Sequence, residues 1–345
     1  MSTGAVGLDT RFHHRVAAHA ASGALRDLLE HYHLSYAPEP LSEGAVFGLS
    51  GALDLRVRIA ADTAPAIDLD GRAPSLEIEL CRHLGLDAEW CATDDPRAGW
   101  ELLHAELECG YPTLVRADVG ALNYRDGRCH DTRHAIVVTS YDAEAGHVWV
   151  ADQCFPDPQR CTLNALAAAR RSQGWPLPAR HALLRLRPPN RLGSPRKAIT
   201  AGLMRTVRSL RDPSVCAHPH EHAGLAAIDA LDATWPQLPE MTGPMLGPTL
   251  AALRFRIRDG GTGGALYRSL QARFLHDGAA LLRSPALGQA ALHCDDLTDA
   301  WRALADALHD DDPNLAHRVA EPWVHRVRQL EHRHLEALET HLGAL

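Results

Sequence analysis

The order of helix and strand patterns over residues 19–152 constrains the fold most strongly. Apolar side chains recur at helical spacing over 19–32, whereas 134–141 and 147–152 are short apolar runs with the length of strands. The segment 142–146 contains Asp and Gly and predicts a hairpin turn between the two strands. Because a helical segment precedes a group of antiparallel strands, the pattern predicts an α+β domain.

The same patterns predict the other elements of this domain. Pro-Ser at 74–75, followed by two glutamates, indicates the start of a helix at 75–84. A strand and a turn are expected within 57–67, and a strand at 181–186 is expected to close the domain. The remaining predictions are helices at 95–109 and 162–171 and strands at 86–91 and 113–117.

A proline-rich segment marks the start of a second domain. Residues 188–195 read Pro-Pro-Asn-Arg-Leu-Gly-Ser-Pro, which is typical of a linker. Beyond it the apolar spacing predicts helices at 198–210, 222–234, 248–255, 264–282, 286–308 and 316–343. The predicted organisation is a flexible tail at 1–11, an α+β domain at 12–188, a linker at 189–197 and an all-α domain at 198–345.

Composition excludes several classes of function. The net charge of −8 provides no general basic surface for nucleic acid, and no apolar run approaches the roughly 18 residues that a membrane-spanning helix needs. The N-terminal residues lack the form of a secretion signal, and the eight cysteines include no Cys-x-x-Cys pair. We therefore expect a cytoplasmic protein with reduced thiols.

Two polar residues at strand ends are candidates for catalysis. His134 begins an apolar strand, where its ring could expose one nitrogen to a cleft and act as a general base. Asp152 ends the next strand, where its carboxylate could accept a hydrogen bond from Nδ1 of His134 and fix the tautomer. The structural alternatives are a histidine that caps a buried strand and an aspartate in a turn.

Four features of the chain resemble the butirosin-biosynthesis acyltransferase family. Residues 19–29 are similar to its His-Cys-x-Ser/Thr-x-Ala-Leu-x-Asn/Asp-Leu-Leu opening, and residues 41–49 resemble its Leu-Ser-Glu-x-x-x-Phe-Gly-Leu stretch. His134 and Asp152 match its later landmarks. The glycine-rich run 258–268 resembles the signature of the helical domain that is usually fused behind it.

This resemblance implies a papain-like cysteine-peptidase fold and an acyltransferase of natural-product (antibiotic) biosynthesis. In such an enzyme, a cysteine at a helix start accepts an acyl or aminoacyl group from the thioester of an acyl carrier protein. The amine of a small-molecule acceptor then attacks the acyl-enzyme. The resemblance makes His134 the base and Asp152 its orienting partner. No cofactor is implied, because the carrier protein supplies the phosphopantetheine.

Ala20 stands where the family has its cysteine. Three interpretations are open, namely an engineered exchange of a native cysteine, a natural pseudoenzyme, and a shifted alignment in which Ser22 or a distant cysteine is the nucleophile. Ser22, Ala24 and Leu25 fix the register of the match, and Ser22 would point elsewhere because successive helical residues diverge by about 100°. We favour the exchange because the rest of the site is kept, and we expect this chain to be inactive.

Two further histidines are candidates through their positions. His14 lies before Ala20 at the spacing where papain-like enzymes keep an oxyanion-hole glutamine, so its ring could donate to an oxyanion. Two polar residues in a loop are the simpler interpretation of His14 and its neighbour. His19 matches the family's histidine before the nucleophile and could shape the helix start without contacting substrate.

The glycine-rich run is a candidate for substrate binding. It lacks the Gly-Lys-Ser/Thr of a phosphate loop, so we expect Gly261, Gly263 and Tyr267 to line the edge of a cleft between the domains instead. The histidine-rich segment 218–222 fits no standard zinc spacing, and no metal is therefore expected.

Two other classes of function remain as alternatives. A thioester hydrolase or cyclase of the same fold would differ in the nucleophile that resolves the acyl-enzyme, and a non-catalytic pseudoenzyme that binds its partners would follow if Ala20 is native. The expected partners are an acyl carrier protein and a small amine acceptor, without nucleic acid or membrane, and a homodimer is compatible with the sequence. Because carrier proteins are usually acidic, a local patch such as Arg205, Arg208 and Arg211 must supply the attraction.

Overall fold

The computed structural model describes residues 12–127, 130–174, 176–212, 220–309 and 311–343. The chain forms two compact units, and each combines two stretches of sequence. The first comprises Met1–Glu43 with Leu84–Leu192, and the second comprises Gly44–His83 with Gly193–Leu345. No helix among the described residues is long and apolar enough to cross a membrane.

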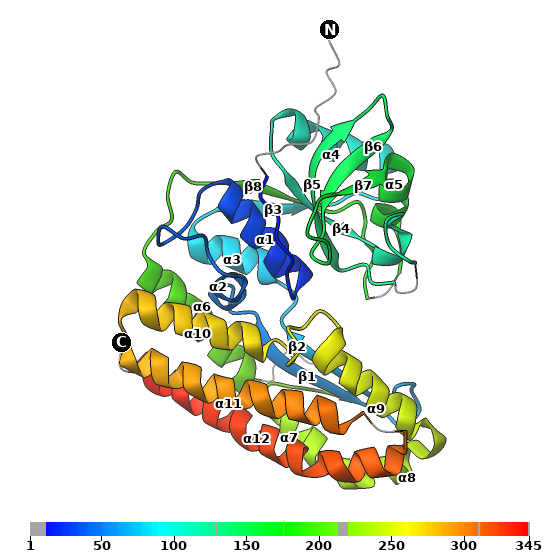
Figure 1. The fold of residues 1–345 in the computed structure, drawn as a ribbon, viewed down its shortest axis with the longest axis vertical. Coiled ribbons are helices and arrows are strands. Elements are labelled where there is room, and N and C mark those ends of the chain that lie inside the picture. The colour runs from blue at the N-terminus through cyan, green and yellow to red at the C-terminus, as the bar shows by residue number, and fades with distance from the viewer. Residues whose placement is uncertain (1–11, 128–129, 175, 213–219, 310, 344–345) are drawn as a thin grey trace. The chain divides into compact units, whose positions relative to one another are not determined.

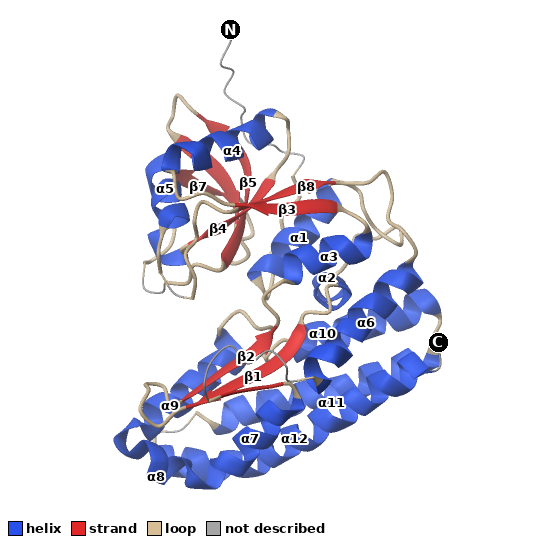
Figure 2. Ribbon diagram, turned by 180° about the vertical axis from the view of Figure 1, so that it is seen from behind, coloured by secondary structure: helices blue, strands red, loops and turns tan. Residues whose placement is uncertain are grey.

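The first unit is built on an antiparallel sheet of six strands in the order β3-β8-β4-β5-β6-β7 (Figure 2). Its hairpin β5–β6 joins the two strands that carry the candidate residues, and Val137 lies opposite Ala151. The elements of this unit are α1 (Ala20–His31), β3 (Asp87–Cys91), α4 (Pro96–Glu108), β4 (Thr113–Ala117), β5 (His134–Asp142), β6 (His147–Ala151), β7 (Gln159–Thr162), α5 (Leu163–Arg171) and β8 (Leu183–Arg187).

The central strand β5 is covered on both faces, which explains its continuous apolar sequence. Ile136 and Val138 belong to a buried cluster that includes side chains of α4 and α5. Successive side chains of a strand alternate between faces, so the buried side chains of Ala135 and Val137 face the other way. Helix α1 also packs against β5 and lies outside that cluster, which indicates that it covers this second face.

The second unit combines a small sheet with packed helices. The sheet has the order β2-β1-β9 and is antiparallel throughout. Helices α10, α11 and α12 pack successively against one another (Figure 1). The elements are α2 (Glu43–Leu49), β1 (Leu53–Ile59), β2 (Ile67–Arg72), α3 (Leu76–Leu84), α6 (Pro195–Arg211), β9 (Glu221–Ala223), α7 (Leu225–Thr234), α8 (Leu238–Thr242), α9 (Leu246–Arg254), α10 (Arg268–Leu282), α11 (Pro285–Ala307) and α12 (Pro313–Gly343).

The predicted α+β class and the helical C-terminal region are confirmed, and the strands predicted at 113–117, 134–141 and 147–152 agree with β4, β5 and β6 within one residue at either end. The beginning of the helix predicted at 222–234 is wrong, because His222 lies in β9 opposite Val57. This pairing ties β1 to the C-terminal region. This pairing is one reason why residues 44–83 belong to the same compact unit as residues 193–345. The sequence pattern instead predicts residues 44–83 as part of the domain at 12–188.

Candidate active site

The hairpin β5–β6 brings His134 and Asp152 together. His134 is the first residue of β5, and Asp152 follows the last residue of β6, which runs antiparallel to it. Nε2 of His134 lies 3.0 Å from Oδ1 of Asp152. The expected contact through Nδ1 is therefore corrected, because the ring presents Nε2 to the carboxylate.

The carboxylate of Asp152 is fully buried and has three side-chain partners. In addition to His134, Tyr124 donates its hydroxyl to Oδ2 at 3.1 Å, and Arg125 donates from Nη2 to Oδ1 at 2.7 Å. Burial alone would raise the pKa of Asp152, but the charges and hydrogen bonds of His134 and Arg125 hold that pKa well below its usual range. Burial and the nearby carboxylate raise the pKa of Tyr124, so its hydroxyl stays protonated and continues to donate.

The other ring nitrogen of His134 is available for chemistry. Because Asp152 is ionised, it can only accept, so its hydrogen bond with His134 requires the proton on Nε2. In that tautomer Arg125 Nη2, which lies 3.2 Å from the same ring nitrogen, donates to the carboxylate at 2.7 Å and not to the ring. In a neutral ring this tautomer leaves a lone pair on Nδ1. None of the hydrogen bonds found among the described residues uses that atom, so it can receive a proton from a nucleophile.

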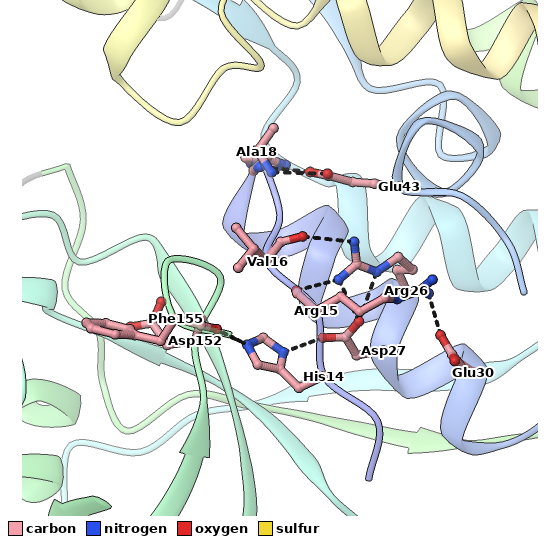
Figure 3. A network of polar contacts seen from close by, with 11 residues as sticks. His14, Arg15, Val16, Ala18, Arg26, Asp27, Glu30, Glu43, Asp152 and Phe155 are labelled. Carbon is pink, nitrogen blue, oxygen red and sulfur yellow. Dashed lines mark hydrogen bonds and ion pairs between the residues drawn. The ribbon is translucent and has the colours of Figure 1, made fainter. Parts of the chain in front are cut away.

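The start of helix α1 is fixed by the buried His19 and by Glu43, whose contact with Ala18 is drawn in Figure 3. His19 is the N-cap, and its Nδ1 lies 2.8 Å from the hydroxyl oxygen of Ser22. The backbone N–H groups of Ala18 and His19 donate to the two carboxylate oxygens of Glu43 at 3.0 Å and 2.7 Å. His19 therefore shapes the helix start, as expected from its position.

His14 connects this segment to the loop that follows β6 (Figure 3). Its Nδ1 lies 2.6 Å from Asp27 Oδ2, and its Nε2 lies 3.1 Å and 2.9 Å from the carbonyl oxygens of Asp152 and Phe155. Burial alone would lower the pKa of His14, but Asp27 and the two carbonyls raise it above its usual value. With both nitrogens occupied, the ring has no N–H to offer an oxyanion in this arrangement, in contrast to the expected role.

Ala20 is the first residue of α1 and is almost completely buried, with 9% of its surface exposed. Three residues earlier, the N–H of Ala17 donates to the carbonyl of Gln153 at 3.0 Å, next to Asp152. Helix α1 also packs against β5, which begins at His134. A thiol in place of the methyl group of Ala20 would lie at the positive end of the helix dipole, which favours a thiolate.

Sequence reasoning missed Tyr124 and Arg125, which contact Asp152 from a loop 28 and 27 residues earlier in the chain, respectively. Cys154, an exposed cysteine just after Asp152, also lies close to Arg125. No sequence motif predicts the role of either residue, because that role depends on how an irregular loop packs against the end of the sheet.

The glycine-rich run belongs to the second unit and forms the turn that leads into α10. Gly261 and Gly263 both have a φ of 72°, a left-handed conformation that favours glycine. Tyr267 also has a positive φ, and its ring stacks on Phe47 with centroids 5.4 Å apart. Only 7% of Tyr267 is exposed, so most of its ring serves packing within this unit.

Two family models match the chain. The model described as "Butirosin biosynthesis protein H, N-terminal" covers residues 19–153, from the N-cap of α1 to the residue after Asp152. The model described as "Domain of unknown function (DUF4872)" covers residues 164–338, which is more than half of the chain. No curated protein matches the chain.

Proposed function

This chain belongs to the family that joins the butirosin biosynthesis protein H N-terminal domain to the DUF4872 domain, and we propose that its first unit is built for acyl transfer from a thioester to an amine. The family name relates the chain to antibiotic biosynthesis. The observation that carries the proposal is the buried His134–Asp152 pair, whose Nδ1 side is unoccupied among the described residues, at the start of a strand on which α1 packs.

The proposed reaction has two steps and needs a thiol at position 20. Nδ1 of His134 takes the proton of the thiol, and the sulfur attacks the carbonyl carbon of a carrier-bound thioester. The new carbon–sulfur bond replaces the bond to the pantetheine sulfur, which leaves with the proton held by His134. An acceptor amine then attacks the acyl-enzyme, passes a proton to His134, and expels the position-20 thiolate, which recovers that proton.

Asp152 is proposed to orient His134 and to stabilise its charged form, as the carboxylate does in other triads. Arg125 and Tyr124 keep that carboxylate ionised and fixed. Arg125 shares the carboxylate with His134, so less of its negative charge is available to the imidazolium than in an isolated pair. His14 is not proposed as an oxyanion donor, because both of its ring nitrogens are hydrogen-bonded.

Ala20 favours a second candidate function for the chain as it stands. A methyl group cannot form the acyl-enzyme, so the protein would hold a carrier-bound acyl group or an acceptor without turnover. The two candidates share one site and differ in a single side chain, which makes them separable by restoring the thiol.

We expect that Ala20→Cys becomes acylated when it is incubated with the acetyl thioester of N-acetylcysteamine, because helix α1, which begins at Ala20, packs on the strand that begins at the retained base His134. Intact-mass spectrometry followed by peptide mapping should locate one acetyl group at position 20. The matched control is Ala18→Cys, which places an exposed thiol two residues outside the helix.

Addition of a primary amine should then release the acetyl group as an amide in the Ala20→Cys protein. Release by water alone would favour the hydrolase alternative. A folded Ala20→Cys protein that is acylated no faster than Ala18→Cys would refute the assignment of position 20.

A further inference from the structure

Helix α6 of the second unit carries a charge that is unusual for this chain. Its sequence over Pro195–Arg211 contains five basic and no acidic residues, although the whole protein has a net charge of −8. Arg196 and Lys197 lie in the first turn of the helix, where the dipole disfavours positive charge. Helix stability therefore does not explain these two cations, and both are exposed.

The basic side chains of α6 differ in how they are used. Arg205 is directed inward, donating to the carbonyls of Ser50 and Gly51 at 3.0 Å and 2.9 Å. Arg211 pairs with Glu339 of α12. Arg208 is exposed and forms no ion pair with any residue that the structure describes. Arg196 and Lys197 likewise form no ion pair with a described residue, so α6 carries three exposed cations of this kind.

An apolar groove lies beside this charge. It has a volume of about 380 Å³ and lies between α6 and the end of α12. Met204, Val207 and Leu342 contribute its apolar lining, and Arg208, Arg211 and Asp212 contribute its charged lining. Met204 is 52% exposed, which is a large exposure for an apolar side chain in the middle of a helix.

We propose that this face of α6, defined as Arg196, Lys197, Met204, Val207 and Arg208 with the adjoining groove, is the docking surface for an acidic helix of the acyl carrier protein. This inference rests on the proposed function for the identity of the partner. Arg208 in the lining of an exposed apolar groove, together with Arg196 and Lys197 on the same helix, complements a helix that presents acidic side chains beside an apolar stripe. The face also provides a local attraction that overcomes the mutual repulsion of two acidic proteins.

The test measures binding directly and does not depend on turnover. An acyl carrier protein with its phosphopantetheine arm is labelled with a fluorophore and titrated with the Ala20 protein, and anisotropy gives the Kd at increasing salt. We expect the affinity to fall as salt rises. Arg208→Glu should weaken binding by about tenfold, because it places like charges opposite one another, and Met204→Asp should weaken it comparably.

The matched control is Arg318→Glu, which makes the same charge reversal at an exposed position on α12. It lies 24 residues from Leu342, which corresponds to about 36 Å along a helix. Its Kd should stay within about twofold of the parent protein. Equal weakening by Arg208→Glu and Arg318→Glu, or no binding by the parent protein, would overturn the docking surface.

A second measurement separates failure of this inference from failure of the proposed function. In the Ala20→Cys protein, acylation by the small N-acetylcysteamine thioester reports on the nucleophile site alone, since no carrier protein is present. Acylation by the carrier-bound acetyl group should fall in Arg208→Glu by the same factor as the affinity. If carrier binding depends on Arg208 but neither thioester reacts, the docking surface stands and the acyl-transfer proposal fails.

Discussion

Replacing His134 by alanine in the Ala20→Cys protein is expected to lower the rate of acylation by about 10³-fold or more. The imidazole is the base that takes the thiol proton, and its loss leaves only the helix dipole to favour the thiolate. The measurement is the rate of mass increase with the acetyl thioester of N-acetylcysteamine. His130→Ala is the matched control, because His130 also pairs with an aspartate, Asp118, and is exposed.

Asp152→Asn in the same background should slow acylation less than His134→Ala does. The amide can still accept from Nε2 and hold the ring, but it cannot stabilise the imidazolium by charge. Full activity of both variants would show that the His134–Asp152 pair is not the catalytic base and its partner.

Removal of His14 is expected to lower the free energy of unfolding by about 2–4 kcal/mol. The side chains of His14 and Asp27 are 4% and 1% exposed, and the carbonyls of Asp152 and Phe155 would lose their donor. Asp27 keeps Arg26 as a partner at 2.8 Å, which limits the loss. Urea unfolding of His14→Ala measures the effect, and His13→Ala, at the exposed neighbouring position, should change stability by less than about 0.5 kcal/mol.

The penalty for losing His14 should depend on pH. The pKa of His14 is raised in the folded protein, so the extra stability of its charged form is fully present below the unfolded value of about 6.5. That stability is lost as the pH rises through the folded pKa. The difference between the parent protein and His14→Ala should therefore be larger near about pH 6 than near about pH 9. A difference that grows with pH would contradict a charged His14.

Local patterns were sufficient to predict the elements that position the site. His134 and Asp152 could be located because His134 begins, and Asp152 ends, an apolar run that has the length of a strand. The short strand β9 could not be predicted, because Glu-His-Ala at 221–223 has no strand pattern and is extended only through its pairing with β1. For the same reason, the grouping of residues 44–83 with the C-terminal region was not apparent from the sequence.

The polar contacts of the site were less predictable than its elements. The spacing of His14 from Ala20 suggested an oxyanion donor, but Nδ1 of the ring is hydrogen-bonded to Asp27, which lies about two turns into α1. Arg125 and Tyr124 reach Asp152 from a loop with no periodic pattern. Such contacts depend on tertiary packing, and they leave no periodic pattern in a single sequence from which they could be predicted.

The central claim is that position 20 is the nucleophile position served by His134, and the most direct test is the pH dependence of thiol alkylation in Ala20→Cys. Iodoacetamide labelling is followed across pH by peptide mass spectrometry, so that the exposed Cys109 and Cys154 are resolved from position 20. An ordinary thiol titrates near about pH 8.5.

The account predicts that the thiol at position 20 becomes half reactive at least about one pH unit below that value, and that His134→Ala moves the midpoint back toward it. The Ala18→Cys thiol should titrate as an ordinary thiol in both backgrounds. A midpoint for Ala20→Cys that equals that of Ala18→Cys and does not respond to His134→Ala would contradict the account.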